Sequence, residues 1–141
     1  MIQKQLWFKT DLFDIEPEED QETNPLCFGR QLANWVKIRL DEESVGRAEI
    51  IPEDWGWCVV VQRKPYLLWV GCVSVHDYEK SASNDRLPQG QDIVWTCIVA
   101  AEPSFLRRLL GADTKVAVES LYKKLKQILV AEPAIVFVPQ P

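Results

Sequence analysis

The chain has 141 residues, of which 47% are apolar and 26% are charged, and this composition is typical of a single soluble globular domain with its own core. Its net charge of −5 argues against a nucleic-acid partner, since phosphates select a basic surface, but it suits a basic protein partner or simply aids solubility. No segment has the roughly 20 apolar residues of a membrane span, and the first residues lack the apolar stretch of a secretory signal. We therefore expect one domain over residues 1–141 in the cytoplasm, with no membrane contact.

The first predicted element is a strand over residues 6–15, whose imperfect alternation suggests a bulge or an edge position. An acidic segment overlaps its end, because Asp11–Glu22 contains seven acidic residues and no basic one. Pro17 lies inside this segment, so residues 16–24 are predicted to form an exposed loop. The candidates for contact with a basic partner in this loop are Glu18, Glu19 and Asp20.

An amphipathic helix is predicted next, over residues 25–42. Asn24 is a typical N-cap and Pro25 a typical first helical residue. Apolar residues then recur at helical spacing, and Gly46 follows where the pattern ends.

The predicted centre of the sheet is a hairpin of two strands, residues 47–62 and 66–76, both rich in β-branched and aromatic residues. The residues between them are few and polar, and Pro65 belongs in this connection because it has no N–H to donate. Residues 77–91 form a predicted polar loop. An apolar strand over residues 93–99 follows, and its nearly continuous apolar character favours a central position.

The last part of the chain contains a short predicted helix over residues 103–110 and a longer amphipathic helix capped by Asp113 or Thr114. Pro133 ends this helix, and residues 134–138 form a last short strand. The order of elements predicts an α+β fold: an antiparallel sheet of about five strands, with two main helices packed mostly on one face.

No catalytic constellation is evident around the single histidine, His76. Cys72 on the same strand would lie about 13 Å away at roughly 3.3 Å per residue, too far for a nucleophile–base hydrogen bond. Cys58 on the neighbouring strand could approach His76, so whether Cys58, Cys72 and His76 converge stays open. Together with Cys27 and Cys97, these cysteines lack the close pairing of zinc ligands and are expected to be buried core residues. Glycine-rich phosphate loops are absent, and we predict no metal and no cofactor.

The segment Pro52-Glu53-Asp54-Trp55-Gly56-Trp57 is the most distinctive of the chain. Adjacent strand residues point to opposite faces, so the two carboxylates are unsuited to one acid–base site. Trp55 and Trp57 share a parity, and two neighbouring tryptophans on an open face would anchor a protein interface. The partner-binding candidates in this segment are Glu53, Asp54, Trp55 and Trp57.

This motif and the following strand with Leu68-Trp69-Val70-Gly71 resemble a family of small uncharacterised bacterial single-domain proteins with a P-E-D-W-G-W strand. The resemblance covers residues 47–138. It implies a bacterial binding protein, similar in kind to the immunity proteins that neutralise toxins, and it brings no catalytic residues.

Three functional hypotheses follow. The first is a non-enzymatic protein-binding domain, such as an immunity-type inhibitor of a basic toxin. The second is a small-ligand-binding protein or hydrolytic enzyme that uses a pocket near Glu53, Trp55, Trp57 and His76. The third is a homo-oligomeric structural subunit that associates through a sheet face left uncovered by the helices.

Overall fold

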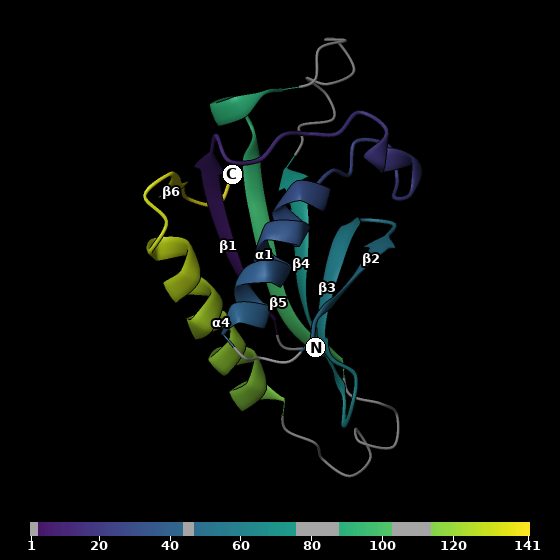
Figure 1. Ribbon diagram of the computed structural model, residues 1–141, viewed down its shortest axis with the longest axis vertical. Coiled ribbons are helices and arrows are strands. Elements are labelled where there is room, and N and C mark those ends of the chain that lie inside the picture. Colours follow the sequence, from purple (N-terminus) through teal and green to yellow (C-terminus); the bar gives the residue numbers. More distant parts are fainter. Residues whose placement is uncertain (1–2, 44–46, 76–87, 103–113) are drawn as a thin grey trace.

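A computed structural model describes residues 3–43, 47–75, 88–102 and 114–141 of the chain (Figure 1). Within these ranges six strands form one fully antiparallel sheet in the order β2-β3-β4-β5-β1-β6. The strands are β1 (Gln3–Thr10), β2 (Glu49–Glu53), β3 (Gly56–Gln62), β4 (Leu67–Val75), β5 (Val94–Glu102) and β6 (Ile135–Phe137).

Two α-helices cover the same face of this sheet, as Figure 1 shows. Helix α1 (Arg30–Glu42) contacts β3 and β4, whereas α4 (Lys115–Val130) contacts β5 and β1. Two short 3-10 turns, η1 (Glu19–Gln21) and η2 (Gly90–Asp92), complete the described elements. The predicted α+β architecture is confirmed, while the predicted helix at 103–110 lies outside the described residues.

The sheet has one more strand than expected because the predicted strand over residues 47–62 reverses direction near its middle. Glu53 pairs directly with Gly56, so Asp54 and Trp55 alone connect β2 to β3. A two-residue connection of this kind is the commonest form of a β-hairpin. The β-branched composition of residues 47–62 correctly predicted strands, but it gave no indication of the turn at Asp54 and Trp55.

Helix α1 begins at Arg30, five residues after the predicted start at Pro25. The segment before it forms a turn instead, in which the Cys27 N–H donates to the Asn24 carbonyl at 3.0 Å and Leu26 has a φ of 68°. Gly29 then passes close to β4, because a Cβ atom at this position would lie within van der Waals overlap of the Cys72 carbonyl. The helix therefore starts where the chain meets the sheet, and the local Asn-Pro signal is overridden.

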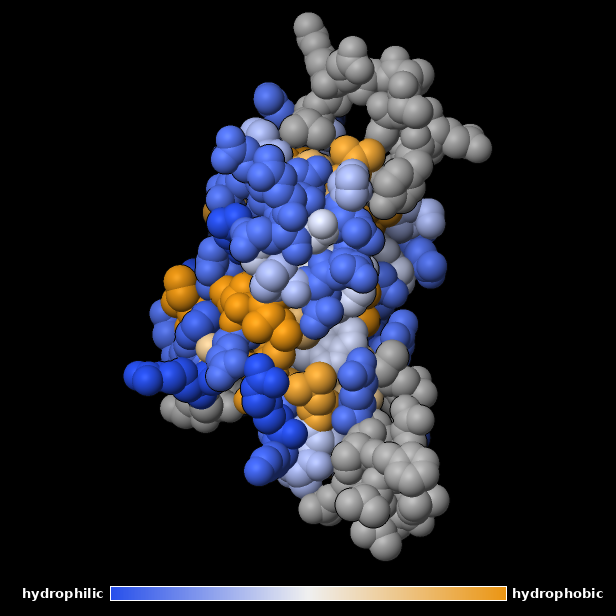
Figure 2. Space-filling view, turned by 90° about the vertical axis from the view of Figure 1, so that its right-hand side faces the viewer, coloured by the Kyte–Doolittle hydropathy of each residue, from blue (hydrophilic) through white to orange (hydrophobic). Residues whose placement is uncertain are grey.

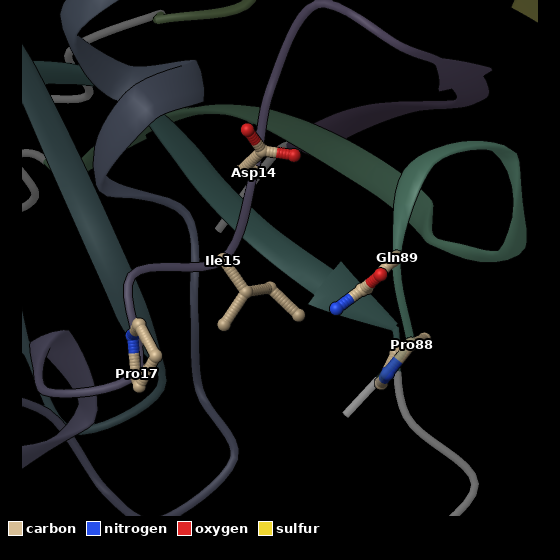
Figure 3. Close-up of a pocket in the computed structure, with 5 residues that line it drawn as sticks. All are labelled: Asp14, Ile15, Pro17, Pro88 and Gln89. Carbon is tan, nitrogen blue, oxygen red and sulfur yellow. The ribbon is translucent and has the colours of Figure 1, made fainter. Parts of the chain in front are cut away.

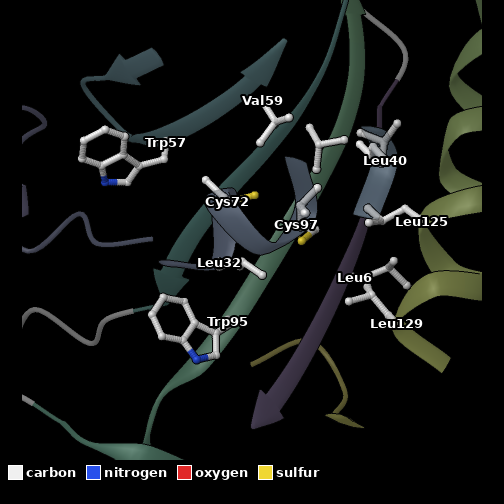
Figure 4. Packing of buried hydrophobic residues seen from close by; sticks show 14 of the residues in the cluster. Leu6, Leu32, Leu40, Trp57, Val59, Cys72, Trp95, Cys97, Leu125 and Leu129 are labelled. Atoms are coloured by element: carbon white, nitrogen blue, oxygen red, sulfur yellow. The ribbon is translucent and has the colours of Figure 1, made fainter. Parts of the chain in front are cut away.

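The main core lies between the sheet and the two helices (Figure 4). Alternate residues of the strands face the apolar sides of α1 and α4, as strand and helix periodicity require. Cys72 and Cys97 lie opposite each other in this core, and Cys27 and Cys58 are also buried. No disulfide joins any of the four, and their burial confirms that the cysteines are core residues. The labelled members of the core in Figure 4 are Leu6, Leu32, Leu40, Trp57, Val59, Cys72, Trp95, Cys97, Leu125 and Leu129.

Candidate binding surface on the outer face of the sheet

The sheet face opposite α1 and α4, called the outer face below, carries a second apolar cluster. Its residues alternate along β2 to β5 with those that face the helices. Its buried members are Cys58, Val60, Trp69 and Ala100, and its partly buried members are Ile51, Leu67 and Ile98. Apolar side chains therefore pack on both faces of this sheet.

Trp55 lies over this outer face and stacks on Trp69. Their ring centroids are 5.4 Å apart and the ring planes are inclined by 31°. Trp69 is 7% exposed and Trp55 is 36% exposed. The indole of Trp55 therefore faces solvent and rests on the buried indole of Trp69. Gly71 makes this packing possible, because a Cβ atom there would lie 2.7 Å from Cη2 of Trp55.

Sequence reasoning missed the contribution of Trp69 and Gly71. The available signal was a glycine in the interior of an apolar strand, which often marks close approach of another group. Trp55, which packs on Gly71, lies in the turn between β2 and β3. The contact between Trp55 and Gly71 therefore depends on the register between β3 and β4. In that register Gly71 is opposite Cys58.

Trp57 lies on the opposite face from Trp55, which corrects the expectation of a tryptophan pair on one face. Trp57 is 4% exposed and belongs to the core between sheet and helices. The guanidinium carbon of Arg30 lies 4.8 Å from its ring centroid. Trp55 belongs to the turn between β2 and β3, so strand alternation does not extend to it.

Trp55 and Trp57 therefore cannot line one pocket, since their indoles are on different faces of the sheet. This corrects the expectation of a pocket near Glu53, Trp55, Trp57 and His76. His76 lies outside the described residues, and its convergence with Cys58 and Cys72 is untested. Those two cysteines also point to opposite faces.

Acidic side chains border the outer face. Glu53 ends β2 and Glu102 ends β5, and Asp54 lies in the turn beside Trp55; all three are exposed. Within the described part of the chain, none of the three carboxylates has a salt bridge. The pKa of the Cys58 thiol is raised to about 12, first by burial and then by the negative charges of Glu53 and Glu102. Among the described residues, the outer face thus combines an aromatic centre with three carboxylates that have no salt bridge.

The acidic segment before α1 has a different role from the one expected, because Glu19 is buried. One carboxylate oxygen of Glu19, Oε1, accepts the N–H groups of Gly29 (2.5 Å) and Arg30 (2.9 Å), and Oε2 accepts that of Glu16 (3.0 Å). Glu19 therefore caps the start of α1 and is unavailable to a partner, which corrects its assignment to the surface.

The neighbours of Glu19 are partly engaged as well. Asp20 is partly buried and accepts the Leu26 N–H at 3.0 Å, whereas Glu18 is exposed. Arg30 pairs with Glu22 at 2.8 Å and lies 3.9 Å from Glu16. Most acidic side chains of this segment thus bind groups at or just before the start of α1. Of the partner-binding candidates in the segment, Glu18 is the one that is exposed.

The edge of the sheet at β2 is unsuited to pairing with a further strand. Pro52 lacks an N–H donor, and Glu49 pairs with Arg63 across the surface at 2.8 Å. Figure 2 views the molecule from this side and shows apolar residues gathered near the middle, among hydrophilic ones.

A cavity of about 400 Å³ lies at a different place, between the segment after β1 and the segment before β5 (Figure 3). Ile15 points into it, and Pro17 and Pro88 lie on either side. Its described lining includes two polar side chains, those of Asp14 and Gln89. Its described lining contains none of the predicted site residues. The lining residues come from two segments far apart in the sequence, so the sequence offered no signal for this cavity.

Among the described residues, no group of three or more His, Cys, Asp or Glu side chains is arranged to hold a metal ion. The described helices include none that is long and apolar enough to cross a membrane. No protein-family model matches the chain, and comparison with curated proteins and with solved structures gave no significant match. The resemblance to small bacterial binding proteins accordingly stays a prediction.

Proposed function

We propose that this chain is a non-enzymatic protein-binding domain that engages a basic protein through the outer face of its sheet. An immunity-type inhibitor of a basic toxin is a function of this kind. The observation that carries the proposal is Trp55, a large side chain that is 36% exposed yet seated on Trp69 in a defined geometry.

Trp55 has the properties of an interface anchor. Tryptophan is enriched at the energetic centres of protein interfaces, because burial of its ring removes a large apolar area from water. Its packing against Trp69 and Gly71 holds the ring in place before binding, so little conformational entropy is lost when a partner covers it.

The charge of the surface favours a basic partner over a second copy of the chain. Glu53, Asp54 and Glu102 border the aromatic centre, and the whole chain has a net charge of −5. Opposite charge on a partner speeds association, whereas like charges facing each other across an interface oppose it. Self-association through the apolar outer face is the second candidate, because its cluster of Ile51, Leu67 and Ile98 is only partly buried.

A capture experiment with matched variants tests the proposal. The wild type, Trp55→Ala and Ile38→Ala are immobilised and exposed to a lysate of the native organism, and bound proteins are quantified by mass spectrometry. Ile38 is the matched control, because it is an apolar side chain that is 56% exposed on α1, in the other layer of the fold.

We expect a stoichiometric partner on the wild type and on Ile38→Ala that is lost from Trp55→Ala. Circular dichroism and thermal unfolding first establish that each variant is folded. A partner retained by all three proteins would place the binding surface elsewhere and contradict the proposal. Light scattering that shows a dimer for the wild type and a monomer for Trp55→Ala would instead support self-association.

A further inference from the structure

The protein contains one complete example of an arginine held between an indole and carboxylates. The guanidinium of Arg30 stacks over Trp57 at 4.8 Å and pairs with Glu22 at 2.8 Å, with Glu16 at 3.9 Å. Guanidinium groups suit this environment because they are planar, weakly hydrated and able to bond to carboxylates while a face rests on an aromatic ring. The arrangement has three parts: a ring, an acidic group and an arginine.

The outer face has two of these three parts. Trp55 supplies a partly exposed indole, and Glu53 and Asp54 precede it directly in the chain. Register places Glu53 on the same side as Trp55: Glu53 follows Ile51 by two residues, Ile51 is opposite Cys58, and Cys58 is opposite the Gly71 that underlies Trp55. Within the described residues, no cation stacks on the Trp55 ring.

We propose that the missing part is supplied by the partner, and that the outer face binds an arginine of a basic, partly apolar segment. The guanidinium stacks on the exposed indole of Trp55 and pairs with the carboxylate of Glu53, the adjacent Asp54 adds negative charge, and apolar side chains of the segment cover the partly buried Ile51. This inference rests on the proposed function and names the chemistry that the surface recognises.

A second copy of the chain is a poorer source of this arginine. Three of the described arginines already lie beside a group of their own chain: a tryptophan ring for Arg30 and Arg39, and a carboxylate for Arg63. Two copies would also bring the same unpaired carboxylates to one interface. The like charges of two copies therefore favour a different protein as the source of the arginine.

Two synthetic peptides test the role of the positive charge. The first is a capped eight-residue peptide of alternating leucine and arginine, and the second replaces each arginine by citrulline, which preserves the shape but is neutral. Dissociation constants are measured by titration, and the Trp55 indole signal in the proton–nitrogen NMR spectrum is identified by its loss in Trp55→Ala. The variants Glu53→Gln/Asp54→Asn and Ile38→Ala complete the set.

We expect the arginine peptide to shift the Trp55 indole signal and to bind at least about tenfold more tightly than the citrulline peptide. Trp55→Ala should weaken binding roughly 3- to 30-fold, the range of a stacked cation. Glu53→Gln/Asp54→Asn should weaken it roughly tenfold at low salt and less at high salt. Ile38→Ala should bind as the wild type does.

Equal affinity for the two peptides, binding that is insensitive to Trp55→Ala, or no binding of either peptide would each overturn the inference. The proposed function fails separately, when the captured cellular partner no longer depends on Trp55. If binding of the captured partner depends on Trp55 but not on Glu53 or Asp54, the proposed function is supported and the inferred recognition of an arginine is refuted.

Discussion

Replacement of Glu19 should destabilise the protein far more than replacement of any other acidic residue in the acidic segment. Its carboxylate accepts three backbone N–H groups, those of Glu16, Gly29 and Arg30, and its side chain is buried. The Glu19 N–H in turn donates to the Glu16 carbonyl at 2.9 Å, so a backbone bond and a side-chain bond together join residues 16 and 19. Removal of the carboxylate would leave these donors without an acceptor at the entrance to α1.

The expected magnitude follows from the number and kind of these bonds. A hydrogen bond to a charged acceptor contributes about 1.5–3 kcal/mol, and loss of a helix N-cap costs about 0.5–2 kcal/mol. The three bonds are not additive, because the loop around Glu16 can relax and admit water. We therefore expect Glu19→Ala to lower the free energy of unfolding by roughly 3–5 kcal/mol, and Glu19→Gln, which keeps one acceptor oxygen, by roughly 1.5–3 kcal/mol.

Urea denaturation followed by circular dichroism measures this effect. With a slope of about 2 kcal/mol per molar urea, Glu19→Ala should move the midpoint down by roughly 1.5–2.5 M. Glu18→Gln is the matched control, since it removes the same charge from an exposed neighbour and should change stability by less than about 0.5 kcal/mol. Equal urea midpoints for Glu19→Gln and Glu18→Gln would refute the role of Glu19 as the cap of α1 and would indicate that its side chain is exposed.

Three further outcomes are expected. The pKa of Asp41 is lowered from 3.8, chiefly by the hydrogen bond from the Ala48 N–H. The ionised carboxylate therefore stabilises the folded protein fully above pH 3.8, and this stabilisation disappears as the pH falls through the lower folded-state pKa. In urea titrations Asp41→Asn should be less stable than the wild type at pH 7 and should approach the wild type at about pH 2–3. The Cys58 thiol, with its pKa raised to about 12, should resist iodoacetamide in the native protein at pH 8.5 and react in urea, and native labelling followed by mass spectrometry would disprove its burial. Gly71→Ala should displace the Trp55 ring and cost roughly 1–3 kcal/mol, visible as a red-shifted tryptophan emission, whereas an unchanged spectrum and stability would contradict the close packing.

The fold was predictable where long periodic segments lie in continuous contact with the core. Helix α4 has four buried residues at helical spacing, and its start after Thr114 agrees with the expected cap position. Strands β4 and β5 are mostly apolar and pair along nearly their whole length. In these elements the local pattern and the tertiary environment require the same structure.

The candidate site was less predictable, because its geometry depends on contacts between distant residues. The start of α1 is set by a carboxylate ten residues before Gly29, and Asn24 and Pro25 imitate a helix start without forming one. Trp55 was recognised as a surface anchor, but its seat on Trp69 depends on a turn and on strand register. Shared parity suggested one face for Trp55 and Trp57, and a two-residue turn was enough to separate them.

The position of β1 in the sheet has a consequence for the order in which the molecule is assembled. β1 is made first but lies between β5 and β6, and its residues Gln3 to Phe8 pair with residues of β5 about ninety positions later. Until β5 has left the ribosome, β2, β3 and β4 can form a local meander while β1 has no neighbour. Such long-range pairing slows folding and leaves strand edges exposed in the meantime. β5 is thus the segment whose arrival joins the two halves of the sheet.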